Sequence, residues 1–204
     1  MKRILYYTLT LSLGLLLSGG SCNPDPIPDP DTYDKGVAIG GAIWATRNVG
    51  EPGKFAATPT SAGMFYQWNR KTGWSVTDPI TSSPAGVSWN ATGASGTAWE
   101  PANDPCPEGW QVPTEAQMTA LIATLNVWNN ATPGRIFGTG VETLFLPAVG
   151  IRNQYFGFEY ANSGLYWLNE GGVAEGGLVY FHSSTCIISG INSAAALPVR
   201  CVKK

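Results

Sequence analysis

The sequence predicts an α+β domain of short, mostly antiparallel strands with one clear helix and long irregular loops. The chain of 204 residues is 44% hydrophobic, which is enough for one buried core. Its 25 Gly and 15 Pro indicate many turns. Short runs rich in aromatic and β-branched residues recur after residue 36, whereas a single segment has strong helical periodicity.

The first element expected is a tight hairpin in "VAIGGAIWATRNVG", where Gly40 and Gly41 separate two short apolar runs. Aromatic and β-branched residues mark four further strand candidates: "GMFYQW", "GLYWLN", "GLVYFHS" and "PVRCVKK".

The helix is expected in "PTEAQMTALIATLN", residues 113–126. Thr114 is placed to cap it, and Gln117 occupies the capping-box position. The apolar positions then follow the helical repeat: Met118, Leu121, Ile122 and Leu125.

The stretch "DPCPEGWQVPTEAQ" leads into this helix. Pro105 and Pro107 favour extended backbone and Gly109 favours a turn. Trp110 and Val112 are expected to enter the core. The stretch is therefore predicted to be a rigid junction.

The N-terminus is predicted to be a secretory signal peptide, residues 1–21. Lys2 and Arg3 precede an apolar run over residues 4–17, which is shorter than the ~20 residues of a spanning helix. Small residues then lead to Cys22, in a pattern that resembles the lipobox of bacterial lipoproteins, although Gly19 replaces the usual Leu. Lipidation of Cys22 would anchor the chain to the outer membrane. The alternative is simple cleavage that leaves Cys22 as a spare thiol.

Residues 22–35, "CNPDPIPDPDTYDK", alternate polar residues with Pro and are predicted to be an extended tether. The acidic residues of this tether resemble the surface-export signal of Bacteroidetes lipoproteins. The alternative is that the tether is only a solvated spacer. The residues are Asp25, Asp29, Asp31 and Asp34.

Three cysteines remain beyond Cys22, and an exported chain meets an oxidising compartment. Cys106 and Cys201 both lie in short, rigid stretches, and their bridge would close a long loop. We therefore predict a Cys106–Cys201 disulfide and a free Cys186.

Composition argues against several functions. Charged residues make up 13% of the chain and the net charge is −2, so no basic surface for nucleic acid is expected. A multi-histidine metal site is excluded, because His182 is the single histidine, and a catalytic triad would depend wholly on it. We therefore expect no cofactor, no metal and no catalysis.

Several motifs occur in the order of the Fibrobacter succinogenes major paralogous domain, which resembles the C-type lectin fold: "GGAIWATRNVG", "GMFYQWN", "CPEGWQVPTEAQMTAL", "LFLPAVGIRN", "GLYWLN" and "VRCVKK". The resemblance implies one lectin-like domain over residues 36–204, carried by secreted or lipid-anchored surface proteins of Bacteroidetes. The stretch from Asn69 to Asn103 departs from the pattern, being long and rich in Gly, Ser and Thr, and the segment from Trp167 to Leu197 is poor in charge.

The implied function is binding of an extracellular glycan or protein, with the membrane reached only through the lipid anchor. A variable protein of a diversity-generating retroelement is a second interpretation, in which the region from Tyr166-Trp167 to Arg200-Cys201 would be diversified. A third is a structural or pilus-tip component. A fourth is a catalyst similar to formylglycine-generating enzymes, whose cysteine pair has no counterpart here.

"EPAND" at 100–104 and "WNN" at 128–130 echo the calcium-dependent signatures of C-type lectins. Two separated fragments do not supply the clustered oxygens that calcium requires. We expect instead a turn around Pro101 and a helix end at Asn129.

Ligand contacts are expected from the C-terminal half, where aromatic rings mix with amides, hydroxyls and one histidine. Trp167 is expected to be buried, and the Asn69–Asn103 stretch is the alternative binding face. The candidate residues are Tyr155, Tyr160, Asn162, Asn169, Glu170, Tyr180, His182 and Ser184.

Overall fold

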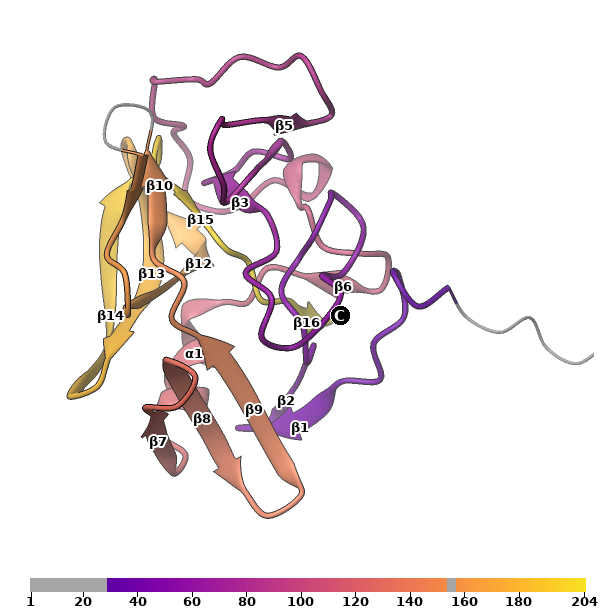
Figure 1. Ribbon diagram of the computed structural model, residues 1–204, viewed down its shortest axis with the longest axis vertical. Helices are drawn as coiled ribbons and strands as arrows, with labels where there is room; N and C mark the ends of the chain where they lie inside the picture. Colours follow the sequence, from indigo (N-terminus) through magenta and orange to yellow (C-terminus); the bar gives the residue numbers. More distant parts are fainter. Residues whose placement is uncertain (1–28, 154–156) are drawn as a thin grey trace, which may run out of the picture.

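The computed structural model describes residues 29–153 and 157–204, in which short strands form four sheets and one α-helix lies beside them (Figure 1). The predicted α+β class is confirmed, and every strand pair among these residues is antiparallel. The predicted signal peptide, the predicted lipidation site Cys22 and the candidate Tyr155 lie outside the described residues. In the described part of the chain, no helix has the length and apolar character of a membrane span.

The strands are β1 (Val37–Ile39), β2 (Ala42–Trp44), β3 (Phe65–Gln67), β4 (Gly73–Trp74), β5 (Ser82–Ser83), β6 (Trp110–Gln111), β7 (Asn126–Asn129), β8 (Gly134–Thr139), β9 (Glu142–Pro147), β10 (Ile151–Asn153), β11 (Gly157–Glu159), β12 (Gly164–Gly171), β13 (Glu175–His182), β14 (Thr185–Asn192), β15 (Ala196–Leu197) and β16 (Val202–Lys203).

The first sheet, in the order β1-β2-β16-β6, brings the two ends of the domain together. β1 and β2 form the predicted hairpin, with Ile39 opposite Ala42. Gly40 and Gly41 have φ of +61° and +79°, the left-handed backbone that a two-residue hairpin turn requires. β16, also predicted, pairs with both β2 and β6.

The second sheet has the order β11-β10-β15-β3-β4-β5. It contains β3, predicted from "GMFYQW", whose three residues are all buried. The short β15 lies between β10 and β3, so this sheet joins the first third of the chain to its C-terminal end.

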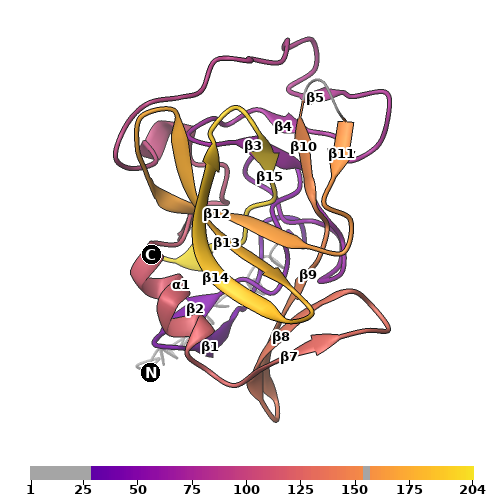
Figure 2. The same ribbon diagram turned by 90° about the vertical axis from the view of Figure 1, so that its left-hand side faces the viewer.

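The third sheet, β12-β13-β14, is shown in Figure 2 with α1 beside it. Its residues alternate between two hydrophobic clusters, so it separates the core into two parts. Trp167 and Leu178 belong to one cluster, and Tyr166 and Val179 belong to the other. Trp167 is fully buried, as predicted. β12 and β13 correspond to predicted strands, whereas β14 was not predicted.

Helix α1 (Glu115–Ile122) begins as predicted. The Thr114 hydroxyl accepts from the Gln117 N–H at 3.2 Å, and the Gln117 side chain accepts from the Thr114 N–H at 2.9 Å. This capping box satisfies backbone donors that a helix start leaves unpaired. Met118 and Leu121 are fully buried.

The predicted end of the helix is wrong, because α1 stops at Ile122. The Thr124 hydroxyl donates to the Leu121 carbonyl at 2.7 Å, and the Asn126 amide donates to the Ile122 carbonyl at 3.1 Å. These side chains replace the next helical hydrogen bonds. Leu125 is consequently 65% exposed, and Asn129 ends strand β7 rather than a helix.

The fourth sheet, β7-β8-β9, was not predicted. Arg135 on β8 ties it to the third sheet. Its buried guanidinium donates to the Asn126 side chain at 2.5 Å and to the carbonyls of His182 and Thr185 at 2.7 and 3.1 Å. These contacts fix both ends of the β13–β14 turn.

The predicted disulfide is confirmed: Cys106 is bonded to Cys201, with a Cα–Cα distance of 6.0 Å. Cys186 is a half-buried free thiol, as predicted, and burial raises its pKa. Trp110 and Val112 are buried, and Gly109 turns the chain at φ +81°. The rigid junction therefore ties the last strand to the segment that enters α1.

A buried arginine lies beside this junction. Arg200 donates to the Asn48 side chain at 2.9 Å and to the Ala45 carbonyl at 3.1 Å. Burial lowers the pKa of Arg200 to about 10 and raises the pKa of neighbouring Tyr166 to about 12. The Asn48 amide also donates to the Tyr166 hydroxyl, so the network links the segments that follow β2 and precede β16 to β12.

Residues 29–35, expected to belong to the tether, contact the domain. The Asp34 carboxylate is buried and accepts from the Gly36 N–H at 2.8 Å and from the Thr46 N–H and hydroxyl at 3.0 and 2.8 Å. Arg47 donates to the same carboxylate at 3.4 Å and to the Tyr33 carbonyl. Asp34 therefore has a structural role, in addition to any part in export or solvation.

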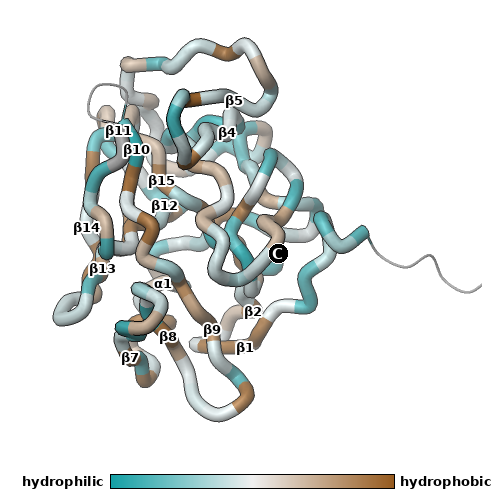
Figure 3. Tube along the Cα trace, in the orientation of Figure 1, coloured by the Kyte–Doolittle hydropathy of each residue, from teal (hydrophilic) through white to brown (hydrophobic). Residues whose placement is uncertain are grey.

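The stretch from Asn69 to Asn103, here called the insertion, forms the long loop drawn in magenta at the top of Figure 1. It contains β4, β5 and a short 3₁₀ turn (Pro101–Asn103), which confirms the turn expected around Pro101. Figure 3 shows its trace as mostly pale, with isolated apolar positions. Such a composition suits a surface loop better than a core element.

Candidate ligand-binding groove

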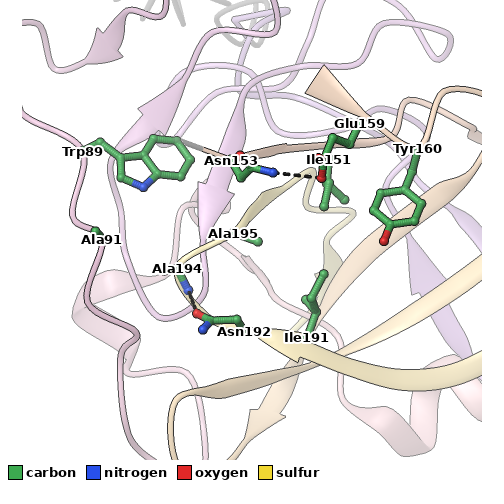
Figure 4. Close-up of a pocket in the computed structure, with 10 residues that line it drawn as sticks. All are labelled: Trp89, Ala91, Ile151, Asn153, Glu159, Tyr160, Ile191, Asn192, Ala194 and Ala195. Atoms are coloured by element: carbon green, nitrogen blue, oxygen red, sulfur yellow. Dashed lines mark hydrogen bonds between the residues drawn. The ribbon is translucent and has the colours of Figure 1, made fainter. Parts of the chain in front are cut away.

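The candidate site is a groove of about 320 Å³ between the insertion, the β10–β11 hairpin and the end of β14 with the turn that follows it (Figure 4). We call it the groove. Its residues come from three parts of the chain that are distant in sequence. The groove therefore combines the C-terminal half of the chain with the insertion. Ligand contacts were expected in the C-terminal half, with the insertion as the alternative binding face.

Two aromatic side chains stand at opposite sides of the groove (Figure 4). Trp89 comes from the insertion and packs against Trp74, with ring centroids 4.9 Å apart. Tyr160 follows β11 at φ +57° and is 53% exposed. The floor between the two rings is apolar and includes Ile151, Ile191 and Ala195.

Polar groups lie along the rim. The Asn153 amide donates to the Glu159 carboxylate at 2.8 Å, and the Asn192 side-chain oxygen accepts from the Ala194 N–H at 2.8 Å. These bonds orient the three side chains that flank the apolar floor: Asn153, Glu159 and Asn192. A carboxylate only accepts hydrogen bonds, whereas an amide both donates and accepts.

Gln67 on β3 holds the walls of the groove in place. Its side-chain nitrogen donates to the Asn90 carbonyl at 2.5 Å and to the Ala194 carbonyl at 2.8 Å. Ser193 adds a bond from its hydroxyl to the Ala94 carbonyl at 2.9 Å. Because Gln67 and Ser193 are buried, the insertion is fastened by bonds that solvent does not weaken.

The groove carries little charge. Among its described lining residues, Glu159 is the one charged side chain, and none is Lys, Arg or His. The described residues contain no group of three His, Cys, Asp or Glu side chains that would hold a metal ion.

The structure does not bring the predicted ligand-binding residues together, and Tyr160 is the one that lines the groove. Asn162 lines a separate apolar hollow beside Val76 and Val149. Tyr155 lies outside the described residues.

Asn169 and Glu170 make structural contacts at the end of β12. The Asn169 side chain accepts from the Trp99 N–H at 2.7 Å. The Glu170 carboxylate accepts from the Glu115 N–H, at the first turn of α1, at 2.7 Å. Both residues therefore orient neighbouring segments of the fold.

The remaining three candidates gather at the β13–β14 turn. The Tyr180 and His182 rings are 5.6 Å apart, and the Ser184 hydroxyl lies 3.3 Å from His182 Nδ1. Tyr180 also packs against the core. Of the three, Ser184 is exposed.

Sequence reasoning missed Trp89 and Asn192 as groove residues. The signal for Trp89 was present, because a tryptophan in a Gly- and Ser-rich loop is a large apolar side chain with little local core to cover it. Asn192 had no comparable signal, since its position depends on the unpredicted strand β14.

Comparison with known proteins finds no matching family model, no similar curated protein and no similar solved structure.

Proposed function

We propose that this chain is a ligand-binding module of the C-type-lectin-like class that holds an extracellular ligand in the groove and catalyses no reaction itself. The observation that carries the proposal is the pair of rings, Trp89 and Tyr160, on either side of an open apolar floor. Aromatic side chains supply large contact area at low entropic cost, and they are enriched where proteins bind partners.

The location proposed is the outer surface of the outer membrane, with a lipid on Cys22 as the anchor. The support is the signal-like N-terminus together with the confirmed disulfide, because stable bridges form in oxidising compartments. The sequence motifs from "GGAIWATRNVG" to "VRCVKK" support the lectin-like fold, as does the arrangement of one helix with short antiparallel strands.

A binding screen of the full chain against immobilised glycans and extracellular proteins tests the function. Trp89→Ala should weaken binding of any ligand found by about 2 kcal/mol or more, which is roughly 30-fold. Val141→Ala is the matched control, because Val141 is 99% exposed in the β8–β9 turn. Equal affinity of Trp89→Ala and the control for every ligand would contradict the proposed site.

A variable protein of a diversity-generating retroelement is the second candidate. Tyr166, Trp167, Arg200 and Cys201, which frame the region concerned, are fully buried, whereas much of β14 between them is exposed. Such a layout allows surface changes without loss of the core. Combined substitution of the exposed β14 positions should leave the melting temperature within a few degrees, and a large decrease would argue against this candidate.

A further inference from the structure

We propose that the ligand of the groove is an uncharged sugar residue. This inference rests on the proposed function and adds the chemical class of the ligand. It follows from three properties of the groove: the placement of its two rings, the charge of its lining and its size.

The first property is the geometry of the rings. Figure 4 shows Trp89 and Tyr160 on opposite sides of the apolar floor, with Asn192 and Glu159 at the rim. A pyranose ring likewise has separate apolar and polar parts, because its C–H faces are apolar and its hydroxyl groups project from the edge. The rings would cover the C–H faces while the rim groups bond the hydroxyls.

The second property is charge. Glu159 accepts hydrogen bonds from hydroxyl groups but repels a carboxylate or phosphate. No cationic side chain among the described lining residues would pair with such an anion. An anionic ligand would therefore lose hydration without gaining a partner, a cost that a neutral sugar avoids.

The third property is size. A volume of about 320 Å³ lies at the small end of the ~300–1,000 Å³ that ligand pockets hold, so the groove suits one small unit. Of the strands that line the groove, β10 is paired on both sides, whereas β11 and β14 are the outer strands of their sheets. An extended peptide adds to an open strand edge, so peptides are included in the experiment.

The experiment uses the full chain on an array of neutral oligosaccharides, the same oligosaccharides with terminal sialic acid, and lysine-rich peptides. We expect saturable binding of neutral glycans and at least tenfold weaker binding of the sialylated forms. Tyr160→Ala should weaken neutral binding at least tenfold. Tyr33→Ala, a tyrosine of matched exposure (54% against 53%), should not change it.

Glu159→Gln provides a second measurement that does not depend on removing a ring. The variant keeps the size of the side chain and removes its charge. Discrimination between neutral and sialylated glycans should decrease at least threefold, while both aromatic walls remain. Circular dichroism and melting temperature establish that each variant is folded.

The outcomes separate this inference from the proposed function. Binding of sialylated glycans or lysine-rich peptides alone, still lost in Tyr160→Ala, would overturn the sugar class and retain the groove as a ligand site. Neutral-glycan binding that is unchanged in both Tyr160→Ala and Trp89→Ala would overturn the site. Absence of any saturable neutral-glycan binding would overturn the inference.

Discussion

Breaking the Cys106–Cys201 bridge is expected to reduce the free energy of unfolding by about 5 kcal/mol. The two cysteines are separated by 95 positions. In the chain-entropy model, a bridge that closes a loop of roughly 100 residues lowers the conformational entropy of the unfolded chain and so stabilises the folded protein by about 4.7 kcal/mol. Native contacts would not replace the bridge, because β16, which follows Cys201, has two residues. A decrease of this size is a large part of the ~5–15 kcal/mol that stabilises ordinary proteins.

The assay is chemical and thermal denaturation of the full chain with both Cys106→Ala and Cys201→Ala. Each kcal/mol shifts the melting temperature of a domain of this size by about 2–4 °C, so a decrease of roughly 10–20 °C is expected. Cys186→Ala is the matched control and should cost less than about 2 kcal/mol, because this side chain is only half buried. A double variant that loses less than about 2 kcal/mol would refute the reasoning. Equal losses in the control would do the same.

Three further predictions concern the anchor, the core and pH. Cys22→Ala should release the chain from outer-membrane fractions into soluble fractions on immunoblots, and full retention would contradict lipidation. Arg135→Met should cost about 3 kcal/mol in urea denaturation because three partly buried acceptors lose their donor, whereas exposed Lys54→Met should cost under about 1 kcal/mol. Burial raises the pKa of Asp104, so its stability contribution is complete below the unfolded pKa and is lost as pH rises through the folded value. Its NMR titration midpoint should lie above 3.8, and a midpoint at or below that value would contradict this account.

Elements specified by neighbouring residues could be predicted from the sequence. Two consecutive glycines between apolar runs define the β1–β2 hairpin, and Thr114 with Gln117 defines the start of α1. The disulfide was predicted for a related reason, because both cysteines lie in rigid stretches that the fold keeps in place.

The end of α1 and the fourth sheet depend on longer-range competition. Leu125 continues the helical repeat, yet its carbonyl accepts from the Gly138 N–H at 2.8 Å, so the chain leaves the helix to join β8. Arg135 then fastens this sheet to the β13–β14 turn. Helical periodicity in a single segment does not reveal such tertiary partners.

The groove was the least predictable feature, because its walls are joined by hydrogen bonds between residues that are distant in the sequence. The same bonds make the groove suitable as a binding site. Its walls meet because Gln67 bonds two carbonyls, at Asn90 and Ala194, that no local pattern connects. Both acceptors are backbone groups, so the neighbouring side chains can be substituted without loss of these two hydrogen bonds. Trp89, which precedes Asn90, therefore lies on a backbone support that does not depend on its own side chain. A scaffold of this kind keeps the groove in position while its chemistry is set by the few side chains that face the ligand.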